Sequence, residues 1–150
     1  MLLSIVVNAW PGTDKFRFRL QLETFMYDTS NNINYLNLCK ELLEGWEKNK
    51  FSIPEDNFKS AFEKHQFHKV DFNHNDVEVI LAIDTTDGSE IEDIFKSWCN
   101  DYDINNQILR AKLGVAGMRN VAMQEYNGEF IIFRDDDDFS ASIAKLLKQC

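Results

Sequence analysis

Three runs of apolar residues punctuate the chain and predict buried strands. They cover residues 2–7, 77–83 and 129–133, and each has the length and composition of a strand buried on both faces. A shorter strand is expected within residues 107–113. Because segments with helical spacing separate these runs, the order of elements predicts an α/β fold: a three-layer, Rossmann-like domain with a mainly parallel central sheet flanked by helices.

Amphipathic patterns predict helices over residues 33–48, from about Pro54, over residues 90–99 and 114–126, and from Ser140 or Ser142 onward. The apolar positions expected to face the core are Leu36, Cys39, Leu42, Leu43 and Trp46 in the first helix, and Val115, Met118, Ala122 and Met123 in the fourth. The first two helices fall in residues 28–76, a stretch that is long for a simple crossover between parallel strands. We therefore expect a helical insertion there.

Residues 15–25 fit two different elements. Apolar and polar residues alternate strictly from Phe16 to Glu23, which favours a strand, in a hairpin with residues 2–7. A helix would instead gather Phe18, Leu22 and Phe25 on one side. Periodicity alone leaves both open.

The length, charge and cysteine content indicate what kind of protein this is. A chain of 150 residues with 44% hydrophobic residues is expected to form one domain with a substantial core. The net charge of −9 argues against nucleic acid or an anionic membrane as the main partner, because both are polyanions. Cys39, Cys99 and Cys150 lack metal-site spacing, which favours a reduced, cytoplasmic protein. The N-terminal apolar run is too short for a signal peptide or a transmembrane segment.

Carboxylates follow two of the predicted strands. Asp84 comes directly after residues 77–83, and four consecutive aspartates, Asp135, Asp136, Asp137 and Asp138, come after residues 129–133. The carboxyl ends of parallel strands share one edge of a sheet, and ligands of open α/β sheets bind at that edge. Hard oxygen ligands there predict Mg²⁺ or Mn²⁺ shared with a phosphate group. The alternative is a solvated acidic loop.

Three linked segments carry a family resemblance. They are residues 114–120 (Gly-Val-Ala-Gly-Met-Arg-Asn), residues 127–133 (Asn-Gly-Glu-Phe-Ile-Ile-Phe) and the aspartate run. Together they resemble the nucleotide-sugar-binding half of family 2 glycosyltransferases with the GT-A fold. Met118 stands where that family usually has Ala. Weaker likeness extends to residues 2–10, where Asn-Ala-Trp replaces Pro-Thr-Tyr-Asn, and to the Asp-Thr-Thr-Asp-Gly-Ser segment that begins at Asp84.

The resemblance implies a role for each matching residue. Asp84 would contact the nucleobase, and Asn8 and Ala9 would line the nucleotide-sugar site. Arg119 would lie near the nucleotide and Asn120 would help to hold its loop. The remaining roles fall to the aspartate run: Asp135 would face the ribose and donor sugar, and Asp137, with Asp135, would hold Mn²⁺ or Mg²⁺. A shift of register by one residue would give these two roles to Asp136 and Asp138, so all four aspartates are kept as candidates.

The implied activity is transfer of a sugar from a nucleotide-diphosphate sugar, UDP-linked, to a glycan or other acceptor. The family places its catalytic base after the metal motif, but no Glu or Asp follows Asp138. The base is therefore unassigned, and we expect the acceptor-binding part to lie outside this chain. Two alternatives remain: a non-catalytic nucleotide-binding or partner module, and a Mg²⁺-dependent phosphatase of the haloacid dehalogenase type. The phosphatase ranks lower because its Asp-x-Asp motif lies near the start of the domain.

Overall fold

The computed structural model describes residues 1–29, 32–48, 55–135 and 141–150. Within these residues, four parallel strands form one sheet in the order β3-β2-β1-β4. The strands are β1 (Leu3–Ala9), β2 (Val77–Asp84), β3 (Asn105–Ala111) and β4 (Phe130–Arg134). The predicted parallel α/β fold is confirmed, and each strand begins and ends within two residues of its expected bounds.

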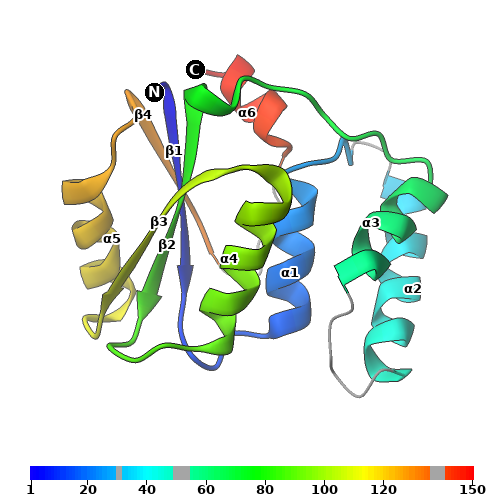
Figure 1. Cartoon of the computed structure of the whole chain (residues 1–150), viewed down its shortest axis with the longest axis horizontal. Helices are drawn as coiled ribbons and strands as arrows, with labels where there is room; N and C mark the ends of the chain where they lie inside the picture. The colour runs from blue at the N-terminus through cyan, green and yellow to red at the C-terminus, as the bar shows by residue number, and fades with distance from the viewer. Residues whose placement is uncertain (30–31, 49–54, 136–140) are drawn as a thin grey trace.

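Helices cover both faces of this sheet (Figure 1). α1 (Lys15–Thr24) and α4 (Glu90–Tyr102) pack on one face, and α5 (Gly114–Glu125) packs on the other. Successive residues of the central strands alternate between the two cores: Ile5 joins the cluster beneath α1 and α4, and Val6 joins the cluster beneath α5. This alternation produces the three expected layers.

The remaining elements lie around this core. α2 (Asn32–Lys48) and α3 (Glu55–Lys64) pack against each other beside α1, and the 3₁₀ turn η1 (His74–Asp76) leads into β2. α6 (Ile143–Lys148) begins with a backbone hydrogen bond of 2.8 Å to the Phe25 carbonyl. Among the described helices, none combines the length and apolar character needed to cross a membrane.

The segment with alternating polarity is a helix, so the strand favoured for residues 15–25 was wrong. Asp14 caps α1 by accepting a 2.9 Å hydrogen bond from the Arg17 backbone N–H. Eight of the ten residues of α1 are buried, because α1 packs against α4 and α3 and shares one core cluster with β1 and β2. Its polar residues are therefore inside: Arg19 pairs with Glu23 at 2.8 Å, and the Tyr102 hydroxyl donates to Glu23 at 2.6 Å. A helix buried on every side shows no helical periodicity.

The apolar stripes predicted for two helices are partly wrong. In α2, Leu42 is buried as expected, but Leu36 is 71% exposed and the buried row is completed by Leu38. In α5, Met118 and Ala122 are buried, whereas two residues expected inside are largely exposed. Those two residues are Val115 and Met123. Each helix presents only a narrow row to the rest of the protein, so part of its apolar face stays in solvent.

The strand before the aspartate run is not a central strand of the described sheet. β4 pairs with β1 alone, and it lies at the sheet edge with intermediate burial. Phe130 is 48% exposed. The expectation of burial on both faces holds for β1 and β2, which are the two inner strands.

A buried carboxylate ties the start of β4 to the other strands. Glu78 on β2 is 3% exposed and accepts hydrogen bonds from the Ser4 hydroxyl at 2.7 Å and the Asn127 backbone N–H at 2.8 Å. The side-chain amides of Asn127 and Gln107 donate to its other oxygen, each at 3.1 Å. The Gly128 backbone N–H in turn donates to the Ser4 hydroxyl at 2.9 Å. This network lies at the amino-terminal edge of the sheet and sets where β4 begins.

Candidate functional site

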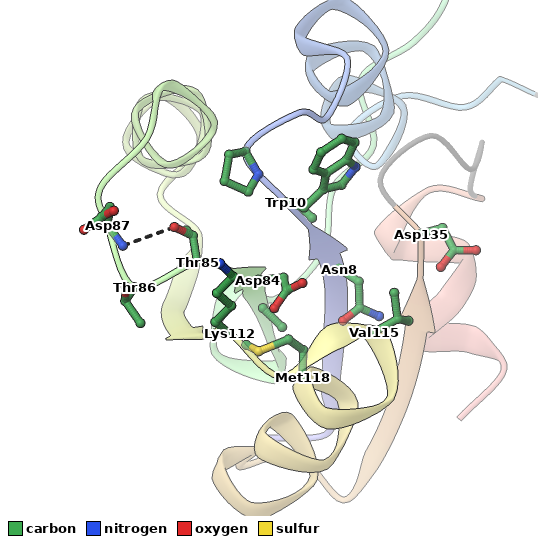
Figure 2. A pocket seen from close by; sticks show the side chains of 13 residues that line it. Asn8, Trp10, Asp84, Thr85, Thr86, Asp87, Lys112, Val115, Met118 and Asp135 are labelled. Atoms are coloured by element: carbon green, nitrogen blue, oxygen red, sulfur yellow. Dashed lines mark hydrogen bonds between the residues drawn. The ribbon is translucent and has the colours of Figure 1, made fainter.

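A cleft of about 670 Å³ opens at the carboxyl-terminal edge of the sheet (Figure 2). It lies between the ends of β1, β2 and β4 and the first turn of α5. Its lining comprises Asn8, Ala9, Trp10, Pro11, Ala82, Asp84, Thr85, Thr86, Asp87, Lys112, Val115, Met118 and Asp135. Four of the residues expected in a ligand site, namely Asn8, Ala9, Asp84 and Asp135, therefore meet in one cavity.

Asp84 connects the end of β2 to the start of α5. Its Oδ1 accepts hydrogen bonds from the backbone N–H groups of Leu113, at 2.9 Å, and Gly114, at 3.1 Å. Leu113 at the N-cap has no side-chain capping bond of its own, so Asp84 supplies the cap from another strand. Gly114 has φ +72°, a left-handed conformation that favours glycine. The carboxylate thus shapes the cleft wall while it lines the cavity.

Asn8 is a buried amide at the end of β1. It is 7% exposed, and neither its Nδ2 nor its Oδ1 has a hydrogen-bond partner among the described residues. Figure 2 shows its side chain between Asp84 and Val115. Buried amides are normally paired, so an unpaired one in a cleft wall is a group suited to a polar ligand.

The next residues of the same loop bring an aromatic ring to the cleft. Trp10 is 57% exposed, and a Cβ added to Gly12 would overlap its indole. The Trp10 backbone N–H donates to the Thr13 hydroxyl at 3.0 Å, which holds this turn together. An exposed indole at the mouth of a polar cleft offers a flat surface for a ring or a sugar.

Asp135 begins the aspartate run at the end of β4. Its carboxylate is 54% exposed, and Arg119 of α5 approaches its Oδ1 to 3.4 Å. The Arg119 guanidinium also lies 5.6 Å from the centre of the Phe133 ring. On its other side, Gln21 of α1 donates a hydrogen bond of 2.5 Å to the Asp135 backbone carbonyl. Arg119 therefore lies beside one residue of the cleft lining without being part of that lining, and its place near a nucleotide stays a prediction.

The other predicted site residues do not line the cleft. Asn120 is on an exposed part of α5 outside the cavity lining. Asp136, Asp137 and Asp138 lie outside the described residues. Among the residues that are described, no three His, Cys, Asp or Glu side chains gather as a metal cage. Asp84 and Asp135 nevertheless supply hard oxygen ligands at the cleft, and Mg²⁺ or Mn²⁺ shared with a diphosphate requires only one or two carboxylates. The donor set fits such an ion.

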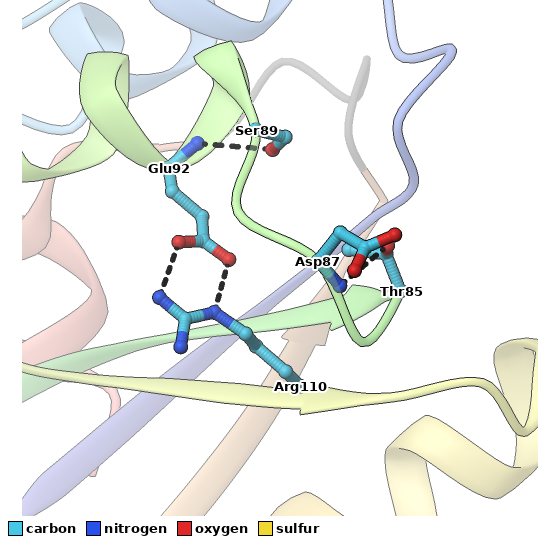
Figure 3. Close-up of polar contacts among 5 residues, drawn as sticks. All are labelled: Thr85, Asp87, Ser89, Glu92 and Arg110. Atoms are coloured by element: carbon cyan, nitrogen blue, oxygen red, sulfur yellow. Dashed lines mark hydrogen bonds and ion pairs between the residues drawn. The ribbon is translucent and has the colours of Figure 1, made fainter.

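The loop between β2 and α4 forms another wall of the cleft (Figure 2), and Figure 3 shows the polar contacts of this loop and of α4. The Thr85 hydroxyl accepts from the Asp87 backbone N–H at 3.1 Å, and Ser89 caps α4 at the Glu92 N–H. The buried Glu92 carboxylate forms two hydrogen bonds with Arg110 of β3, at 2.5 and 2.6 Å. Those bonds hold the pKa of Glu92 below its usual range. The loop thus begins at β2 and leads into a helix that is bonded to β3 through Glu92 and Arg110.

Sequence reasoning missed several lining residues. Lys112 follows β3, which ends at Ala111, whereas the sequence predicted a short strand somewhere within residues 107–113, a range that includes the lysine. Val115 and Met118 were assigned to the core, and both line the cleft. The position of Lys112 after an apolar strand, next to the glycine that opens α5, was a signal that could have placed it at this edge.

The chain was compared with models of known protein families. Residues 55–149, more than half of the chain, match the family model described as glycosyl transferase family 2. The chain belongs to glycosyl transferase family 2. No curated protein matches the chain significantly.

Two solved structures share the fold of this family 2 chain. The crystal structure of S. aureus TarS is 16% identical with a TM-score of 0.54, and the match covers 99% of this chain and 19% of that one. The crystal structure of S. aureus TarS 1-349 is also 16% identical, with a TM-score of 0.52, and covers 99% of this chain and 31% of that one. At this identity the likeness establishes the GT-A-like fold. The chain spans about a fifth to a third of the solved chains it matches.

Proposed function

We propose that this chain is the donor-binding part of a glycosyltransferase. It binds a nucleotide-diphosphate sugar, UDP-linked, together with Mn²⁺ or Mg²⁺, and the sugar passes to a glycan or other acceptor. The observation that carries the proposal is the convergence of Asn8, Asp84 and Asp135 on one cleft at the carboxyl edge of a parallel sheet. Membership of family 2 favours this activity over the haloacid dehalogenase type of phosphatase.

The charges around the cleft suit a diphosphate despite the net charge of −9. Lys112 lines the cavity and Arg119 lies 3.4 Å from the Asp135 carboxylate, so two cationic side chains are available to a ligand that carries several negative charges. The carboxylates of Asp84 and Asp135 would repel a bare diphosphate. A divalent cation removes that conflict, because it is attracted to the carboxylates and the phosphates at once.

The residues of the chain divide the work of binding. Asp84 and Asn8 contact the nucleobase end of the donor, and Trp10 offers an aromatic face beside them. Asp135, with Asp136, faces the ribose and donor sugar, while Asp137 and Asp138 complete the metal ligands. Once bound, the cation neutralises charge that grows on the leaving nucleoside diphosphate. Arg119 and Lys112 stabilise the same negative charge electrostatically, without transferring a proton to it.

Calorimetric titration of UDP tests the donor site. UDP should bind with Mn²⁺ or Mg²⁺ present and bind far more weakly when the cation is chelated. Asp135→Asn and Asp137→Ala should each weaken the cation-dependent binding, by about ten-fold or more. Asp71→Asn is the matched control, because Asp71 is an exposed carboxylate in the segment that leads into β2. It should bind UDP as the wild type does.

Two results would contradict the proposal. UDP binding that is absent, or that ignores the cation and both aspartate variants, would exclude the metal–diphosphate site. Binding of UDP without release of UDP from UDP-sugars, measured in the protein that contains this chain with a panel of glycan acceptors, would instead favour the non-catalytic nucleotide-binding module.

A further inference from the structure

A buried amide of α1 reaches the backbone at the start of the aspartate run. Gln21 is 0% exposed, and its Nε2 donates a hydrogen bond of 2.5 Å to the Asp135 carbonyl, which lies 114 residues later in the chain. Its sequence neighbours Leu20 and Leu22 are buried apolar residues of the core. Gln21 is thus a buried polar side chain between two buried apolar neighbours.

The hydrogen bond from Gln21 holds the chain just beyond the last residue pair of the sheet. The pairing of β1 with β4 ends at Val7 and Arg134, and Asp135 is the first residue beyond it. β4 is an edge strand of the described sheet, so no second strand within the described residues extends the ladder past that point. The Gln21 amide therefore fixes the Asp135 peptide group against α1, while the Asp135 carboxylate lies in the cleft lining and within 3.4 Å of Arg119.

Packing does not account for a glutamine at this position. Burial of an amide is unfavourable unless its polar atoms are paired, and Gln21 Oε1 has no hydrogen-bond partner among the described residues. Within the described residues, only the N–H half of the amide forms a hydrogen bond. A methionine has a similar shape and would avoid the unpaired oxygen. What the glutamine adds is the bond to Asp135.

We infer that Gln21 is a positioning residue for the donor site: it holds the backbone of Asp135 so that the Asp135 carboxylate stays in the cleft lining for the cation and diphosphate. This inference rests on the proposed function of Asp135. Partners behind metal ligands usually contribute ten- to a hundred-fold in metal affinity, and we expect a loss of about that size when the amide is removed. Gln21 does not itself line the cleft, and within the described residues its side chain forms a hydrogen bond to this peptide carbonyl, so its effect should appear in the cation-dependent binding.

The variant Gln21→Met tests the inference, with Leu22→Met as its matched control on the same helix. Calorimetry with UDP and Mn²⁺ should show an affinity at least about ten-fold lower for Gln21→Met and unchanged for Leu22→Met. Urea unfolding should show Gln21→Met to be no less stable than Leu22→Met, since it removes an unpaired buried oxygen. In an Asp135→Asn background, the further effect of Gln21→Met should be smaller than about two-fold, because the two residues act through one carboxylate.

A spectroscopic measurement tests the bond without any ligand. The ¹³C shift of the Asp135 carbonyl should move upfield in Gln21→Met and stay in place in Leu22→Met, since a carbonyl loses deshielding with its hydrogen bond. An unchanged shift, or an unchanged affinity for UDP with Mn²⁺ in a wild type that binds both, would overturn the role of Gln21 alone. A wild type that binds no UDP with Mn²⁺ would overturn the donor site, and the positioning role with it.

Discussion

Replacement of Glu78 by glutamine is the sharpest test of how the strands are held in place. The carboxylate is 3% exposed and accepts four hydrogen bonds, from Ser4, Gln107 and both N–H donors of Asn127. A glutamine keeps the shape but has one acceptor oxygen. If that oxygen takes the place of Oε1, the bonds from Ser4 and the Asn127 backbone survive. The new NH₂ group then faces the two amide donors that Oε2 accepted.

The expected loss follows from those two bonds. Each hydrogen bond to a charged group contributes about 1.5–3 kcal/mol, and the easier burial of a neutral amide offsets part of the sum. We therefore expect Glu78→Gln to lower the free energy of unfolding by about 2–4 kcal/mol, a large share of the 5–15 kcal/mol typical of a domain. With a urea m value of about 2 kcal/mol/M, the midpoint should fall by about 1–2 M. Glu129→Gln removes the same charge at an exposed position and should change stability by less than about 0.5 kcal/mol.

The pH dependence gives an independent check. Burial alone would raise the pKa of Glu78, but hydrogen bonds from Asn127, Ser4 and Gln107 outweigh it and hold the pKa below the usual value. A carboxyl with a depressed pKa stabilises the fold above its unfolded pKa of about 4.3 and loses that contribution as the pH falls through the folded pKa. The gap between wild type and Glu78→Gln should thus be full at pH 7 and shrink below about pH 4. Equal stability of the two proteins at pH 7, or a gap that persists in acid, would refute the reasoning.

Two further predictions concern the cleft wall and the turn before β4. Asp84→Ala should cost about 1 kcal/mol in urea unfolding because the N–H groups of Leu113 and Gly114 lose their cap, whereas Asp84→Asn keeps an acceptor and should cost less; equal losses would contradict the capping role. Gly128→Ala should cost about 1–3 kcal/mol, because its Cβ would lie 2.7 Å from a backbone nitrogen of β1. Gly88→Ala is its control, with nothing within 4 Å of the added carbon, and should change the urea midpoint little; a similar loss in both would rule out the close approach as the cause.

The site residues that the sequence predicted are those that directly follow a predicted strand. Asp84 follows a run of buried residues, and Asp135 follows another, so parallel pairing was enough to bring both to one edge. Asn8 and Ala9 reached the same cleft for the same reason, as the next strand end. Lys112 was not predicted as a site residue because it fell within the range expected to hold a strand, residues 107–113, whereas β3 ends at Ala111.

The parts that sequence missed depend on contacts between distant elements. α1 showed a period of two because the sheet, α3 and α4 bury it on all sides, which removed the polar face that marks a helix. β4 read as a central strand because its apolar run does not reveal how many neighbours it has. The bond from Gln21 to Asp135 spans 114 residues and leaves no pattern in either segment.

The amino-acid sequence by itself determined the strands, their parallel direction and the edge of the sheet at which carboxylates gather, and its motifs indicated the family. The strands follow from hydrophobic burial, which acts on short stretches and repeats along them. Only the tertiary structure decided which face each helix buries, which strands lie inside, and which side chains hold the site residues from behind. Those outcomes depend on directional hydrogen bonds such as that of Gln21 and on close approaches such as that of Gly128, which exist only once distant segments have packed together.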